Sequence, residues 1–153
     1  MQVKDRLIKL GINLPNAAVP VANYVPYTIS GKQIMISGQV PIVNGSVEGN
    51  TGKIGLDLTI EQGKKIARIC GINLVAQVNN AVNGKLDTVR CLKLGVFINA
   101  VDNFDAHPEV ANGASDLMVE VFGDNGKHAR SSVGVASLPR GVAVEIDAVF
   151  EII

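Results

Sequence analysis

Apolar residues recur every three or four positions from Ile60 to about Val82, which predicts a long amphipathic helix. Thr59 stands where the first helical residues need a side-chain acceptor, and Gln62 follows three residues later, as in a capping box. Asn83-Gly84 then ends the pattern. This is the most clearly marked element of the chain.

Two further segments carry helical spacing. Val3, Leu7 and Leu10 predict a short N-terminal helix that Gly11 stops. Pro108 is well placed to open a second long helix, which runs to about Phe122. The chain therefore has two long helices and one short one.

Five other segments are predicted strands, because they are rich in branched apolar residues or alternate between apolar and polar ones. They span residues 24–29, 33–37, 88–99, 130–137 and 142–153. Pro26 makes the first an edge or irregular strand, since proline cannot donate to a ladder. Ser30-Gly31-Lys32 and Leu138-Pro139-Arg140-Gly141 read as turns, so the last two strands are expected to form an antiparallel hairpin.

The resulting order, β-β-α-β-α-β-β, predicts a single α+β domain over residues 1–153 with both long helices on one face of one sheet. Residues 1–11 are a helical addition. The last two strands alternate: Val144, Ile146 and Ala148 share one face, and Glu145 and Asp147 share the other with Val149. The second face includes valine as well as serine and glycine, so we expect it to pack against a partner.

Composition narrows the class of protein. The charged share of 18% is below the usual quarter, which suggests that part of the surface is buried against another subunit. The formal charge is zero and there is no basic run, so nucleic-acid binding is disfavoured. No apolar stretch is long enough to cross a membrane. Cys70 and Cys91 lie in apolar runs and read as buried, reduced thiols, so we expect a cytoplasmic protein.

Motifs for nucleophilic, phosphate-binding or metal chemistry are absent, and His107 and His128 are isolated from each other. Charged residues within strands are more informative. Arg130 opens one strand, and Glu145 lies between Val144 and Ile146, where a carboxylate is costly unless it is paired. Across the expected hairpin the two residues would lie near one end of the sheet. They would form either a salt bridge at a subunit interface or a functional site.

Several blocks of sequence resemble the Rid (reactive intermediate deaminase) or YjgF family. They are Ala129-Arg130-Ser131-Ser132-Val133, Leu138-Pro139, Val144-Glu145-Ile146, Tyr24 with Ser37-Gly38-Gln39-Val40-Pro41, and Val96-Phe97 through Asn103-Phe104. The resemblance covers most of the chain from about Ala22. It implies a chorismate-mutase-like fold, no cofactor, and a homotrimer with three clefts between subunits.

The resemblance also implies roles for individual residues. Arg130 would clamp the carboxylate of a small imino acid, and Glu145 would place or activate the attacking water. Tyr24, Ser37, Asn112 and Ser132 would line the same pocket. This chain departs from the family pattern at two positions: Ser132 replaces a common cysteine, and His128 replaces a proline.

Three functions follow as hypotheses. The first is hydrolysis of 2-imino or 2-enamino acids to 2-oxo acids and ammonia. The second is a non-catalytic module that binds small carboxylate metabolites in the same clefts. The third is a ribonuclease activity attached to some relatives, which the neutral charge and the lack of a histidine pair disfavour.

Overall fold

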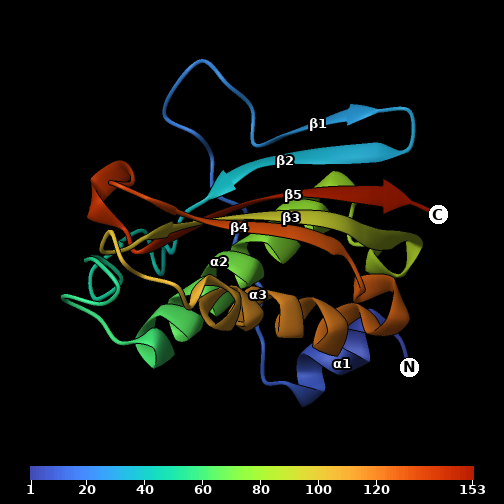
Figure 1. The fold of residues 1–153 in the computed structure, drawn as a ribbon. Coiled ribbons are helices and arrows are strands. Elements are labelled where there is room, and N and C mark those ends of the chain that lie inside the picture. Colours follow the sequence, from blue (N-terminus) through green and yellow to red (C-terminus); the bar gives the residue numbers. More distant parts are fainter.

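In the computed structural model, which describes residues 1–153, five strands form one mixed sheet in the order β1-β2-β5-β3-β4. Figure 1 shows β1 at one edge of this stack and β4 at the other. The strands are β1 (Tyr27–Ser30), β2 (Gln33–Gln39), β3 (Val89–Asn99), β4 (Ala129–Val135) and β5 (Val144–Ile152). The element order and the edge position of the first strand were both predicted correctly.

Three α-helices accompany the sheet: α1 (Val3–Lys9), α2 (Ile60–Ala81) and α3 (His107–Phe122). The capping box of α2 is present. Thr59 Oγ1 accepts from the Gln62 amide at 3.1 Å, and Gln62 Oε1 accepts from the Thr59 amide at 2.8 Å. Short 3₁₀ turns occupy Leu86–Thr88, Gly123–Gly126 and Pro139–Gly141. No helix is both long enough and apolar enough to span a bilayer.

The core lies between the sheet and the pair α2 and α3. Leu94 and Ile98 of β3, and Ile146 and Phe150 of β5, are completely buried on this side of the sheet. The two helices approach closely at Gly113 of α3, where a Cβ atom would overlap the Lys64 carbonyl oxygen of α2. The depth at which α3 sits on α2 is therefore set by the absence of a side chain at this position.

The expected hairpin between the last two strands is wrong. β3 lies between β4 and β5, pairing with β4 in parallel and with β5 antiparallel. The Leu138–Gly141 segment is a 3₁₀ turn with Arg140 at φ +56° that carries the chain across the end of β3. Burial explains the order: β3 and β5 are buried at alternate residues and take the centre, whereas no residue of β4 is fully buried, as suits an edge.

The sheet face away from α2 and α3 carries no other element of the chain. Glu145 and Asp147 of β5 lie on it, as does Phe97 of β3, and Val133 of β4 and Met35 of β2 expose 47% and 42% of their surface there. The predicted alternation of the last strands is confirmed. No helix or strand of the chain covers this face.

The N-terminal helix α1 packs against the end of α3 and the Leu86–Thr88 turn. Val3 and Leu7 are buried, and the Val3 amide donates to Asp87 Oδ1 at 2.9 Å. The segment that follows α1 projects beyond β1 in Figure 1 before the chain enters the sheet. Tyr24 lies in this segment rather than in the first strand, which begins only at Tyr27.

Candidate functional site

Arg130, the second residue of β4, is held by α3. Its Nη1 donates to Asn112 Oδ1 at 2.8 Å and to Ser115 Oγ at 3.0 Å. These two bonds account for both hydrogens on Nη1. Nε and Nη2 make no hydrogen bond within the chain, and no carboxylate forms an ion pair with the guanidinium. The side-on edge of the fork is thus available to a planar acceptor such as a carboxylate.

Secondary structure places these groups. Arg130 lies opposite the buried Leu94 in the ladder, so its side chain is on the helix side of the sheet. Asn112 and Ser115 are three residues apart on α3 and therefore share one helix face. Asn112 was predicted to line the site, and the structure puts it against Arg130.

A further chain of hydrogen bonds extends from Ser115. Its Oγ lies 2.9 Å from His128 Nε2, and His128 Nδ1 lies 2.6 Å from the Gly126 carbonyl oxygen. A carbonyl only accepts, so Nδ1 carries a hydrogen, and in the tautomer with a single ring hydrogen Nε2 accepts from the Ser115 hydroxyl. Ser115 then turns its lone pairs toward Arg130.

A hollow of about 310 Å³ opens beside this network, lined by Ser115, Asp116, Val119, Lys127, His128 and Arg130. Lys127 forms an exposed ion pair with Asp124 at 2.9 Å. Ser132, two residues after Arg130, lies on the same face of β4, opposite Val96. The lining thus combines the Arg130 guanidinium and Lys127 with one carboxylate, that of Asp116.

Glu145 lies elsewhere. It is opposite Phe97 on the open face of the sheet, and a Cβ at Gly38 would come within 2.8 Å of its Oε2 atom. Burial raises the pKa of the Glu145 carboxyl, and the neighbouring Asp147 charge raises it further. The register of β2 against β5 shifts between Ile36 and Gln39, which marks a bulge in β2. Gly38 thus leaves room for a half-buried carboxylate beside this bulge.

The remaining predicted residues, Ser37 and Tyr24, lie near the end of β2 that carries Gly38. Ser37 precedes Gly38, and its Oγ donates to the Val25 carbonyl at 2.8 Å. Tyr24, beside Val25, is 56% exposed. Ser37 thereby ties the Tyr24 segment to the β2 bulge near Glu145.

The predicted residues thus form two groups, and the expectation that Arg130 and Glu145 lie near each other is wrong within one chain. Arg130 of β4 pairs with Leu94 of β3, and Leu94 pairs with Ala148 of β5. Glu145 is therefore two strands away from Arg130 and three residues before Ala148 along β5. Strand spacings put their Cα atoms roughly 14 Å apart, with side chains on opposite faces. No salt bridge joins them.

Sequence reasoning missed Ser115 and left His128 without a partner. The two residues are 13 positions apart, on α3 and in the approach to β4, and only the fold brings them together. The one signal in the sequence is the spacing of Ser115, three residues after Asn112, which places both side chains on the same face of the predicted helix.

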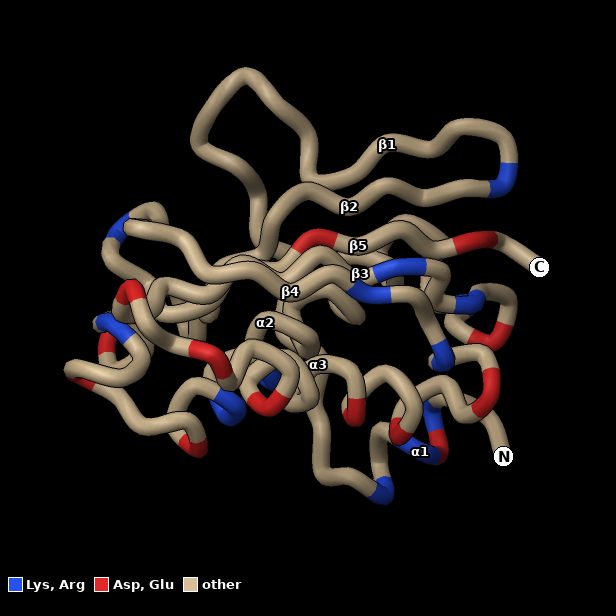
Figure 2. Tube along the Cα trace, viewed as in Figure 1, with Lys and Arg blue, Asp and Glu red and all other residues tan.

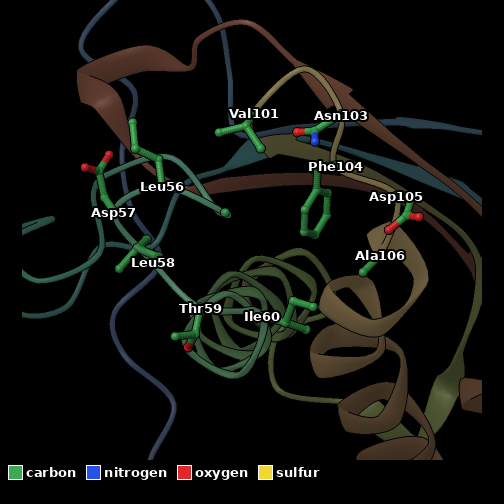
Figure 3. A pocket seen from close by; sticks show the side chains of 11 residues that line it. Leu56, Asp57, Leu58, Thr59, Ile60, Val101, Asn103, Phe104, Asp105 and Ala106 are labelled. Carbon is green, nitrogen blue, oxygen red and sulfur yellow. The ribbon is translucent and has the colours of Figure 1, made fainter.

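A larger hollow of about 540 Å³ lies at the starts of α2 and α3. Figure 3 shows Phe104 pointing into it, with Leu56 and Asp57 on the loop before α2. None of the predicted site residues lines this hollow, so it is separate from the Arg130 network.

Neither cysteine is a reactive group. Burial, and then the charge of Glu145, raises the pKa of the Cys70 thiol far above its ordinary value. Burial raises the pKa of Cys91 to about 12. Thiolate chemistry is therefore suppressed at both positions.

The family model described as "YjgF/chorismate mutase-like, putative endoribonuclease" matches residues 4–144. The fold thus defines a small α+β protein of one mixed five-stranded sheet covered by helices on one face. The chain belongs to the YjgF, or Rid, family.

Relatives support the same assignment. The chain is 48% identical to protein TCP17 of Trypanosoma cruzi over 99% of its own length and 94% of that protein. It is 30% identical to a 2-iminobutanoate/2-iminopropanoate deaminase of Dermatophagoides farinae over 90% of the chain and 92% of that protein. The crystal structure of Atu1372 from Agrobacterium tumefaciens, a protein of unknown function, is 43% identical, with a TM-score of 0.92 over 99% of this chain and 92% of that one.

Proposed function

We propose that this protein hydrolyses small 2-imino and 2-enamino acids to 2-oxo acids and ammonia, in clefts formed where two copies of the chain meet. The observation that carries the proposal is the Arg130 guanidinium. One of its nitrogens is fixed by α3, its Nε and Nη2 make no hydrogen bond or ion pair within the chain, and the residue lines a small hollow. Similarity to a 2-iminobutanoate/2-iminopropanoate deaminase supports the substrate class.

Hydrolysis of an imine needs few catalytic groups. An imine carbon is electrophilic, so water adds to it, and the resulting amino alcohol loses ammonia to leave a carbonyl. Arg130 would fix the substrate by its carboxylate, which is unchanged in the reaction. Glu145 would hold the attacking water and accept a proton from it. The raised pKa of Glu145 brings this group closer to the range in which a general base is effective.

The separation of Arg130 from Glu145 favours a composite cleft. β4 and β1 are the two free edges of the sheet, and the open face between them is uncovered. A second copy that brings its β1–β2 end against β4 would place its Glu145, Ser37 and Tyr24 opposite the first copy's Arg130. A homotrimer closes this heterologous contact into a ring with three equivalent clefts.

A ribonuclease receives no support from the charge distribution. Apart from neighbouring basic segments on β3 and β4, lysines and arginines are scattered among acidic residues in Figure 2, and no basic band runs across the molecule. His107 contacts Phe104 edge-on, and His128 is bonded to Ser115 and Gly126, so the two histidines do not act as a pair.

The test is turnover of freshly generated 2-aminoacrylate, followed through appearance of pyruvate above the rate in buffer alone. The proposal predicts acceleration by the parent protein and loss of acceleration in Arg130→Ala. If parent protein binds 2-oxobutanoate but leaves the hydrolysis rate unchanged, the non-catalytic carboxylate-binding module becomes the better account.

A further inference from the structure

We propose that Ser115 and His128 are positioning residues for Arg130, and that they determine which edge of its guanidinium is presented to the ligand. The inference rests on the proposed role of Arg130 as the carboxylate clamp. Neither residue is placed in contact with the reacting atoms. Their task is to hold the clamp through a hydrogen-bonded chain that begins at a backbone carbonyl.

The chain of bonds has one consistent direction. The Gly126 carbonyl oxygen accepts from His128 Nδ1, so His128 Nε2 is left as an acceptor. The Ser115 hydroxyl donates to it, and Ser115 Oγ accepts from Arg130 Nη1. In the tautomer with one ring hydrogen, on Nδ1, each group in this chain of bonds has a single role as donor or acceptor.

The consequence concerns the shape of the ligand site. Asn112 and Ser115 together occupy both hydrogens of Nη1, which removes the end-on Nη1–Nη2 edge from use. The Nε–Nη2 edge remains. A carboxylate must therefore dock side-on, and this fixes its plane and the direction in which the rest of the substrate extends.

This series of hydrogen bonds matters because it restricts the motion of the Arg130 side chain. An arginine side chain is flexible, and a clamp that samples several rotamers loses affinity to the entropy of ordering. Asn112 alone supplies one anchor, about which the guanidinium can turn. Ser115 supplies the second, and His128 fixes Ser115 by occupying its hydroxyl hydrogen. The terminal anchor is Gly126, a buried residue at which a Cβ would overlap the Met118 carbonyl oxygen of α3.

The test compares Ser115→Ala with Ser115→Thr, which keeps the hydroxyl, and with Ser30→Ala, the same replacement at an exposed serine at the end of β1, outside the hollow. Calorimetry with 2-oxobutanoate should show about 3- to 30-fold weaker binding for Ser115→Ala, recovery in Ser115→Thr and parent affinity in Ser30→Ala. With 2-aminoacrylate, KM should rise in Ser115→Ala with a smaller change in kcat, since the water-placing group is elsewhere. His128→Ala should weaken binding in the same direction.

A double-mutant cycle separates this role from a merely structural one. If Ser115 acts through Arg130, Ser115→Ala should add nothing to the loss already caused by Arg130→Ala. The Arg130 Nε–H resonance should also be sharp and slowly exchanging in the parent and averaged in Ser115→Ala, whatever the activity.

The outcomes distinguish two failures. Parent-like binding and an ordered Arg130 resonance in Ser115→Ala, with binding lost in Arg130→Ala, would overturn the positioning role and leave the clamp intact. Equal binding of 2-oxobutanoate by the parent and Arg130→Ala would overturn the clamp itself and the positioning role with it.

Discussion

At the scale of single residues, the proposed function depends on Arg130, whose Nη1 is bonded to α3 while Nε and Nη2 have no partner within the chain. Arg130→Ala removes a bidentate, charge-assisted contact to the ligand carboxylate. We expect a loss of roughly 2–4 kcal/mol, or about 30- to 1,000-fold in affinity or kcat/KM. Arg130→Lys should restore only part of this, because an ammonium has no planar fork. Calorimetry with 2-oxobutanoate measures both variants.

The control for Arg130→Ala and Arg130→Lys is to show that each variant still folds and assembles as the parent does. Both should keep the thermal stability and the mass of the parent, because Asn112 and Ser115 are partly exposed and can bond to water when the guanidinium is gone. If Arg130→Ala instead falls apart while its remaining folded fraction binds normally, Arg130 is an interface residue.

Glu145 is expected to affect turnover rather than binding. Glu145→Gln keeps the shape of the side chain but cannot accept a proton from water, so kcat should fall strongly with little change in KM. Burial and the Asp147 charge raise the carboxyl pKa, so the ionised, active form appears only at higher pH. Parent kcat should therefore rise with pH through a value above the ordinary 4.5, and Glu145→Gln should lack this rise. Equal turnover by the two proteins would make Glu145 structural.

The predictability of the site differs from residue to residue. Arg130 and Glu145 stand out because charges within apolar strands are costly, and Asn112 follows from the family resemblance. Ser115 and His128 could not be paired, since their bond depends on the turn at Gly123–Gly126 that aims the imidazole at α3. A histidine in a loop carries no sequence signal of where its nitrogens point.

At the scale of elements, the position of α3 controls the anchors of Arg130. Gly113 lies against the α2 backbone and is flanked by Asn112, so a methyl group there must push the helices apart. We expect Gly113→Ala to lower the free energy of unfolding by about 2–3 kcal/mol, to be measured by urea denaturation.

Gly71→Ala is the matched control on α2, because the one close approach of its Cβ would be to the end of the Leu117 side chain, at 2.8 Å, and its distance of 3.5 Å to Ala114 is an ordinary contact. Relief of that contact and a better helix propensity should leave stability nearly unchanged. Similar destabilisation by both substitutions would mean that the close approach at Gly113 does not set the helix spacing.

Helices were easier to predict than strand order. Periodicity and the Thr59 capping box locate α2 within a residue or two, because both are local signals. Strand pairing is set by burial over long sequence separations, and the Pro139–Gly141 turn imitates a hairpin although β3 inserts between its strands. The serines and glycine of β4, against the apolar alternation of β3, were the available sign that β4 is an edge.

At the scale of the whole molecule, the open sheet face calls for a partner. Met35, Phe97, Val133 and Val149 share this face with two carboxylates, and nothing in the chain covers it. We expect a homotrimer, for which light scattering should give about three times the chain mass of 16.1 kDa. A stable monomer that still hydrolyses imines would contradict the composite cleft.

The measurement that tests the central claim most directly is turnover by mixed oligomers of Arg130→Ala and Glu145→Gln chains, co-refolded in equal amounts. If each cleft takes Arg130 from one copy and Glu145 from its neighbour, random mixing rebuilds both in about one quarter of the clefts. With mixed species verified by native mass spectrometry, the account predicts recovery of about one quarter of parental 2-aminoacrylate hydrolysis. Mixed oligomers no more active than the two separate variants would contradict it.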